Sequence, residues 1–161
     1  YNLLFRAIEF ELQQMCVEHD VSILPYCPLA QALLTGKFED ADEVPEGRAR
    51  TRHFSPDRPQ SRHDEAGAEE ETFTAVERVR EICEDIGEPM ADVALAWLLE
   101  QPGVTSVLAG ARNPEQVEMN ARAADLDLPE DVLAQLDQAT ADLKEQLGPN
   151  MDMWQTEPRI R

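Results

Sequence analysis

Lysine is almost absent from this chain: among its 161 residues, lysine stands only at positions 37 and 144. The 14 Lys and Arg residues face 33 Asp and Glu residues, which gives a formal net charge of −19. Nucleic acids and anionic membranes bind positively charged surfaces, so this composition argues against both as partners. Any phosphate site must therefore be local. The acid excess resembles proteins adapted to high salt, with an ordinary acidic surface as the alternative.

Cysteine and histidine are also scarce, with three of each. Neither set has the close spacing of metal ligands, so we expect no metal site. An odd number of scattered cysteines favours reduced thiols in a cytoplasmic protein, and we see neither a signal peptide nor a membrane-length apolar run. Because the chain begins at Tyr1 without methionine, we expect a fragment of a longer protein. The residues concerned are Cys16, Cys27, Cys83, His19, His53 and His63.

Hydrophobic periodicity predicts helices separated by two short strands. Apolar runs at 21–25 and 106–109 predict buried parallel strands, and strands separated by helices indicate an α/β fold. Two strands leave sheet edges open, so we expect further strands from outside this chain or from a second copy. The predicted helices cover residues 9–18, 69–86, 90–100, 114 to about 124, and a stretch from 129 with inward-facing residues as far as 143, besides a short helical turn at 30–37.

Two segments are predicted to be irregular. Residues 38–68 form a long polar loop with acids in its first half and arginines in its second half. A loop of this length either covers a ligand, here an anionic one, or is a solvated surface segment. The tail at 148–161 lacks periodicity, and we expect it to lie over other structure or to be loose.

The stretch 105–120 combines an apolar strand with the start of a helix. Gly110 follows the strand, Asn113 is a helix cap, and Gln116 stands three residues after that cap. Free backbone N–H groups at the helix start and the guanidinium of Arg112 are suited to an anion. The alternative is an ordinary turn with a surface arginine.

Five short motifs are spread over nearly the whole chain. They are YCPL at 26–29, LLTGKF at 33–38, VALAWLL at 93–99, AGAR at 109–112 and QVEMN at 116–120. In this order they resemble the aldo-keto reductases. The resemblance implies a (β/α)8 barrel of the TIM type, which typically needs about 250 residues. Residues 1–161 would then be one unit, the C-terminal half of the barrel, with 21–25 as its seventh strand and 106–109 as its eighth.

The resemblance also implies that NADPH is the cofactor. Tyr26 would stack on the nicotinamide ring, because an aromatic face supports a flat ring. Arg112 would bind the 2′-phosphate, since a guanidinium matches phosphate geometry, while Gln116 and Asn120 would read the adenine edge. The implied cofactor-binding residues are Tyr26, Cys27, Leu29, Lys37, Gly110, Arg112, Gln116 and Asn120.

The sequence departs from the family pattern at four positions near this site. Family members commonly have Ser where Cys27 stands, and a thiol is a weak hydrogen-bond donor for the pyrophosphate that it would contact with Leu29. Glycines of the family are replaced by Ala30 and Ala32, and a frequent Glu is replaced by Met119. These changes predict lower affinity or altered preference for the cofactor.

The family's catalytic Asp, Tyr, Lys and His belong to the first half of the barrel, and no position here matches them. The resemblance therefore implies an NADPH-dependent reductase of aldehyde or ketone substrates, of which this chain is the cofactor-binding half and is inactive alone. We expect it to need the missing N-terminal half or a second copy. The alternatives are a non-enzymatic, nucleotide-binding regulatory subunit on the same scaffold, and a stand-alone half-barrel module that assembles with another chain.

Overall fold

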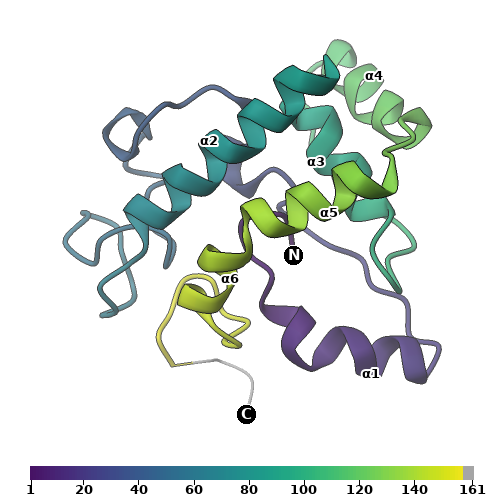
Figure 1. Ribbon diagram of the computed structural model, residues 1–161. Helices are drawn as coiled ribbons and strands as arrows, with labels where there is room; N and C mark the ends of the chain where they lie inside the picture. Colours follow the sequence, from purple (N-terminus) through teal and green to yellow (C-terminus); the bar gives the residue numbers. More distant parts are fainter. Residues whose placement is uncertain (158–161) are drawn as a thin grey trace.

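The computed structural model describes residues 1–157 and is rich in helices (Figure 1). Helices α2 and α5 lie side by side across the molecule, α3 packs against α2 and α4, and α1 lies apart at the lower edge of the view. The α-helices are α1 (Leu12–Glu18), α2 (Glu69–Ile86), α3 (Met90–Leu99), α4 (Pro114–Arg122), α5 (Glu130–Ala139) and α6 (Ala141–Leu147). Short 3-10 helices are η1 (Ala7–Phe10), η2 (Ala30–Thr35), η3 (Ala41–Glu43) and η4 (Ala123–Asp125).

The best-specified helices have clear stop and start signals. Helix α2 ends at Gly87, whose φ of 74° is readily adopted only by residues such as glycine. Helix α4 begins after Asn113, whose side-chain oxygen accepts the N–H of Gln116 at 2.9 Å, with Pro114 in the first helical turn. Both boundaries agree with the sequence prediction, because they depend on neighbouring residues only.

The two predicted strands form only isolated contacts within residues 1–157. Ile23 pairs with Val104 and Tyr26 with Leu108, both in parallel. Three backbone hydrogen bonds join the segments, among them Leu108 N to Pro25 O at 2.9 Å. The two segments thus lie side by side and run in the same direction, as adjacent strands of a parallel sheet do. The prediction of full strands at 21–25 and 106–109 is nevertheless wrong for the described structure. Each segment pairs only with the other one among the described residues, and two short strands without a third form only a marginal sheet.

Two predicted helices are divided differently. The helix predicted at 9–18 starts only at Leu12, because Glu9 lies in η1 and its carboxylate receives the Arg6 guanidinium at 2.7 Å. The helix predicted from 129 through 143 is broken at Thr140 into α5 and α6. The Thr140 hydroxyl donates to Leu136 O and accepts from Arg6 Nη1 at 2.9 Å.

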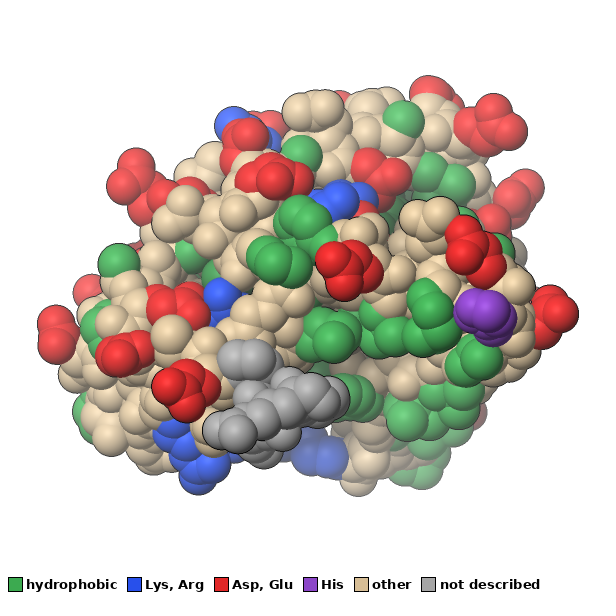
Figure 2. Space-filling view, turned by 90° about the horizontal axis from the view of Figure 1, so that it is seen from below, with side chains coloured by type: hydrophobic (Ala, Val, Ile, Leu, Met, Phe, Trp, Pro, Cys, Tyr) green, Lys and Arg blue, Asp and Glu red, His purple; other side chains and the backbone are tan. Residues whose placement is uncertain are grey.

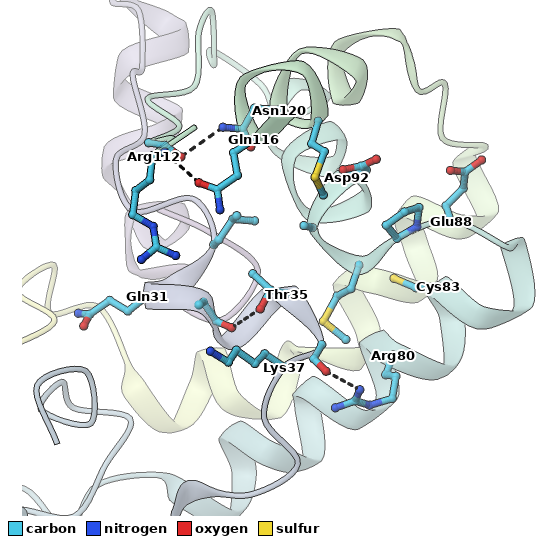
Figure 3. Close-up of a pocket in the computed structure, with 18 of the residues that line it drawn as sticks. Gln31, Thr35, Lys37, Arg80, Cys83, Glu88, Asp92, Arg112, Gln116 and Asn120 are labelled. Carbon is cyan, nitrogen blue, oxygen red and sulfur yellow. Dashed lines mark hydrogen bonds between the residues drawn. The ribbon is translucent and has the colours of Figure 1, made fainter. Parts of the chain in front are cut away.

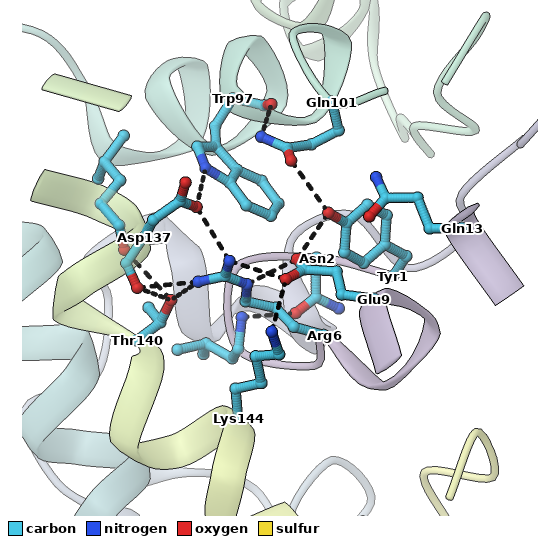
Figure 4. A network of polar contacts seen from close by, with 12 residues as sticks. Tyr1, Asn2, Arg6, Glu9, Gln13, Trp97, Gln101, Asp137, Thr140 and Lys144 are labelled. Carbon is cyan, nitrogen blue, oxygen red and sulfur yellow. Dashed lines mark hydrogen bonds and ion pairs between the residues drawn. The ribbon is translucent and has the colours of Figure 1, made fainter. Parts of the chain in front are cut away.

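A buried polar network ties the N-terminal segment to α3 and α5 (Figure 4). Arg6 bonds both carboxylate oxygens of Glu9 and lies 3.1 Å from a carboxylate oxygen of Asp137, which also accepts the Trp97 indole N–H. Although burial opposes it, the hydrogen bonds and charge of Glu9 raise the pKa of Arg6. Tyr1 donates to Glu9, and burial with that carboxylate raises the pKa of its phenol. Tyr1 is therefore a structural residue.

One hydrophobic core joins the helices to the N-terminal segment. Trp97 at its centre has no exposed surface, and nearly all of α3 is buried, as its apolar circumference predicts. Other fully buried side chains of this core include Leu3, Leu4, Leu34, Phe54, Val79, Val93, Leu98 and Leu136.

The long loop and the tail pack against each other. Arg52 of the loop is 4% exposed and donates from Nη2 to Leu147 O at 2.6 Å and from Nη1 to Asn150 O at 3.0 Å. Its backbone N–H bonds Met153 O at 2.8 Å. Residues 148–157 of the tail therefore contact the long loop, while 158–161, which the tail prediction also covers, lie outside the described residues.

The surface carries acidic side chains over much of the face seen in Figure 2, where hydrophobic side chains also gather. Large apolar side chains with about half of their surface exposed include Val21, Leu24 and Leu108 on the two strand segments. Among residues 1–157, no helix is both long and apolar enough to cross a membrane.

Candidate functional site

A cavity of about 830 Å³ lies between η2, the end of α2, the start of α3 and α4. Figure 3 shows Arg112, Gln116 and Asn120 at one end of this main cavity, with Lys37 and Arg80 at the other. The cavity is therefore lined by residues that follow the strand segment 21–25 and by residues that follow the strand segment 106–109. Because the two segments run in parallel, their carboxyl ends lie at the same edge, where such folds bind their ligands.

Six of the eight residues predicted to bind a cofactor line this cavity. They are Leu29, Lys37, Gly110, Arg112, Gln116 and Asn120. Tyr26 and Cys27 do not line it. The fold thus brings together residues that are far apart in sequence: Lys37 and Arg112 are separated by more than 70 positions. The roles of all eight stay predictions.

The turn that carries Arg112 is held by amide side chains. Gln116 Oε1 accepts the backbone N–H of Arg112 at 2.9 Å, and Asn120 Nδ2 donates to Gly110 O at 3.3 Å. These bonds hold the backbone between the strand segment and α4, while the Arg112 guanidinium remains exposed to the cavity. Both amides therefore position the turn, in addition to any contact with a ligand.

Three cations of the main cavity have no ion-pair partner among the described residues. They are Lys37, Arg48 and Arg112. By contrast, Arg80 pairs with Glu77 at 3.0 Å and donates to Gly36 O and Phe38 O. In a chain of net charge −19, these three side chains give the cavity cationic groups that an anion can contact, on the side away from its acidic wall.

Arg48 is a cavity residue that motif reasoning did not single out, although the arginine-rich half of the 38–68 loop was a signal for it. The other arginines of this loop include Arg52, which holds the tail, and Arg58, which pairs with Glu69 at 2.8 Å. The hydrogen bond from Arg58 lowers the pKa of Glu69. Only the folded structure distinguishes Arg48, which lines the cavity, from Arg52 and Arg58, which hold other segments in place.

The opposite wall of the cavity is acidic and carries a buried thiol. Glu84, Glu88 and Asp92 line it beside Cys83. Burial, with a smaller effect of the Glu84 charge, raises the pKa of Cys83 to about 12. That thiol is therefore protonated and not a nucleophile near neutral pH. The described residues contain no group of three or more His, Cys, Asp or Glu side chains that could hold a metal ion.

The segment after the first strand segment has an unusual backbone. Ala30, Gln31 and Ala32 have φ values of 45°, 56° and 80°, and Cys27 has 52°. Left-handed conformations cost non-glycine residues roughly 1 kcal/mol each and are concentrated at functional sites. They also shape η2, whose residues line one wall of the main cavity.

Tyr26 lies beside the tail instead of in the main cavity. This residue is 51% exposed, and its ring lies nearly parallel to the Trp154 indole, with an interplanar angle of 8° and 6.4 Å between ring centroids. Cys27 is half-buried, and its carbonyl accepts the side-chain N–H of Asn2 at 3.1 Å.

The sequence is similar to several curated oxidoreductases. It is 33% identical to the L-glyceraldehyde 3-phosphate reductase of Escherichia coli over 96% of this chain and 42% of that protein. It is 32% identical to the NADH-specific methylglyoxal reductase of the same species over 80% of this chain and 36% of that protein. The chain thus spans less than half the length of these relatives.

Two further comparisons concern another function class and the fold. A probable voltage-gated potassium channel subunit beta of Arabidopsis thaliana is 26% identical over 78% of this chain and 37% of that protein. The crystal structure of a thermostable aldo-keto reductase with the inhibitor epalrestat matches with a TM-score of 0.56 and 22% identity, over 86% of this chain and 37% of that one. This likeness supports the aldo-keto reductase fold of the TIM-barrel type.

The sequence model described as "Aldo/keto reductase family" matches residues 1–141, most of the chain. The match includes η2, α4 and the main cavity between them. With the fold likeness and the shared order of motifs, it establishes that this chain belongs to the aldo/keto reductase family.

Proposed function

We propose that the intact protein is an NADPH-dependent oxidoreductase that reduces aldehyde or ketone carbonyls, and that this chain forms its cofactor-binding half. The observation that carries the proposal is a set of three cations around one cavity of a strongly acidic chain, Lys37, Arg48 and Arg112, which have no ion-pair partner within residues 1–157. A dinucleotide with a 2′-phosphate has anionic groups at separate points, which fits cations at both ends of the cavity.

The residues of the chain would divide the cofactor between them. Arg112 would bind the 2′-phosphate through its planar guanidinium, with Gln116 and Asn120 holding the turn behind it. Lys37 and Arg48 would bind the pyrophosphate, and Tyr26 would carry the nicotinamide ring, which supplies the hydride when the cofactor is bound. The backbone of η2 would approach the phosphates.

The remaining parts of the reaction belong to residues outside this chain in our proposal. No segment of the sequence matches the family's catalytic Asp, Tyr, Lys and His, so the chain alone is expected to be inactive. The N-terminal half of the barrel would supply them and cover the strand segments. The exposed side chains of Val21, Leu24 and Leu108, each about half exposed, support such a cover.

Replacing Arg112 tests the cofactor and its phosphate. We expect Arg112→Ala in the intact protein to weaken NADPH binding about 10- to 100-fold, since charge-assisted hydrogen bonds are worth about 1.5–3 kcal/mol. NADH binding should change by less than about threefold, because NADH lacks the 2′-phosphate. Isothermal titration calorimetry measures both. Arg62→Ala is the matched control, since Arg62 is exposed and lies outside the main cavity.

Two results would contradict this proposal. Equal weakening of NADPH and NADH binding by Arg112→Ala would show that Arg112 does not distinguish the two cofactors. Unchanged binding of both would remove the phosphate site from this cavity. Reduction of methylglyoxal or a glyceraldehyde phosphate, followed by NADPH absorbance, tests the activity of the intact protein.

The second candidate is a nucleotide-binding regulatory subunit without catalysis. Similarity to a probable channel subunit beta favours it, as do Cys27, Ala30, Ala32 and Met119 at positions where the family pattern differs. Such a subunit would bind NADPH in the calorimeter without turning over any carbonyl substrate.

A further inference from the structure

The indole of Trp154 stacks on one side of the Tyr26 ring. The two rings lie 8° from parallel with 6.4 Å between their centroids. Trp154 lies in the tail, 128 positions after Tyr26 in the sequence. Parallel stacking of this kind is one of the preferred arrangements of aromatic pairs.

This pair has no room for a third ring. A flat ring between two parallel rings needs about 7 Å between the outer planes, because carbon atoms in contact are about 3.5 Å apart. The separation of two nearly parallel planes does not exceed the distance between their centroids, which is 6.4 Å. A nicotinamide ring therefore cannot lie between the two rings while Trp154 keeps its position.

The backbone around Trp154 is held, so the indole is the movable part. Trp154 N–H donates to Asp152 Oδ1 at 2.9 Å, and Arg52 bonds the carbonyls of Leu147, Asn150 and Met153. The Trp154 side chain itself is only half-buried. Rotation about its side-chain torsions would move the indole away from Tyr26 without breaking these backbone contacts.

We propose that Trp154 gates the nicotinamide subsite: its indole closes one face of Tyr26 and must swing aside before a nicotinamide ring stacks there. This inference rests on the proposed function, which assigns the nicotinamide to Tyr26. The main cavity would bind the phosphates and the adenosine of NADPH without this movement, because Tyr26 and Trp154 do not line it. The gate thus acts on one end of the cofactor only.

A gate lowers the apparent affinity for the ligand that opens it. The apparent Kd equals the intrinsic Kd divided by the fraction of molecules in the open state. With an open fraction of about 10–30%, removing the indole tightens binding about 3- to 10-fold. A residue that instead formed a wall of the ring site would have the opposite effect when removed.

The test compares two ligands on the intact protein by isothermal titration calorimetry. NADPH carries the nicotinamide, whereas adenosine 2′,5′-bisphosphate carries only the adenosine end. Trp154→Ala should tighten NADPH binding about 3- to 10-fold and change bisphosphate binding by less than about twofold. Trp154→Phe keeps an aromatic face on Tyr26 and should stay near the original NADPH affinity. Trp154→Leu, which keeps an apolar contact without a flat ring, replaces the alanine variant if that variant unfolds.

The outcomes separate the gate from the proposed function. Unchanged or weaker NADPH binding by Trp154→Ala, with normal bisphosphate binding, overturns the gate and leaves the cofactor site intact. Failure of the original protein to bind either ligand overturns the proposed function. A change of tryptophan emission on NADPH binding that disappears in Trp154→Phe would place this indole beside the cofactor, since the other tryptophan, Trp97, is fully buried. Tighter NADPH binding by Trp154→Ala then supports a gate, and weaker binding a wall.

Discussion

At the scale of single residues, His53 shows how burial sets a proton affinity. Its ring is 1% exposed, Nε2 donates to Leu4 O at 2.8 Å, and Nδ1 accepts from the Thr51 hydroxyl at 3.0 Å. Burial lowers the pKa of His53 to about 4, against the raising effect of the Leu4 carbonyl. The neutral ring thus belongs to the folded state, where it joins the long loop to the N-terminal segment.

This pKa predicts a loss of stability in acid. The unfolded chain binds a proton on His53 near pH 6.5, whereas the native state does so only near pH 4. The free energy of unfolding therefore decreases as the pH is lowered from 6.5 to 4. The contribution is on the order of 3 kcal/mol at most. In urea titrations at pH 7 to 4, His53→Gln should show a flatter dependence on pH than the original protein. His19→Gln, at an exposed position, should show the same dependence on pH as the original protein. Equal pH dependence of the original protein and both variants would show that His53 is not responsible.

At the scale of elements, the entry into α2 depends on one glycine. Gly67 has a φ of 82°, and a Cβ there would lie 2.2 Å from Phe54 O. The loop and the helix thus approach closely, where His53 O also accepts the N–H of Ala68 at 3.3 Å. Gly87 at the other end of α2 has a φ of 74° but open space around it.

These differences predict a graded series of alanine variants. Gly67→Ala should destabilise the protein by more than about 3 kcal/mol, because it adds a clash to backbone strain. Gly87→Ala should cost about 1 kcal/mol from its left-handed conformation alone. Gly47→Ala is the control, because Gly47 has neither a positive φ nor a neighbour within 4 Å. Denaturant melts measure all three, and a Gly67→Ala variant as stable as Gly47→Ala would refute the close approach.

At the scale of the whole molecule, the dominant feature is charge. Acidic side chains outnumber basic ones by 33 to 14, and several arginines are engaged in buried structural contacts, such as Arg6 and Arg52. The unpaired acids therefore repel one another across the surface (Figure 2). Repulsion of this kind is screened over about 30 Å at 0.01 M salt and about 3 Å at 1 M.

Screening predicts that the intact protein melts at a higher temperature in molar KCl than at low salt. A triple variant of exposed positions on α2, with Glu70→Gln, Glu81→Gln and Asp85→Asn, should show a smaller rise because it has less charge to screen. Differential scanning calorimetry at 0.01 and 1 M KCl measures both. A melting temperature that does not rise with salt would contradict the interpretation as a protein adapted to high salt.

The sequence by itself determined the features that depend on nearby residues and on shared motifs. Periodicity with Gly87 set both ends of α2, and Asn113 set the start of α4. Five motifs in order indicated the family, and through it six residues of the main cavity. These signals are local or are carried by the resemblance, so they need no knowledge of distant contacts.

Only the tertiary structure decided the features that join distant segments. The break at Thr140 depends on Arg6, the place of Arg48 in the cavity depends on the path of a long loop, and the cover on Tyr26 depends on Trp154 in the tail. Within the described residues the predicted strands are reduced to isolated bridges, because two short paired segments without a third strand form only a marginal sheet. In each case the free energy comes from contacts between residues far apart in the chain, which periodicity and spacing do not record.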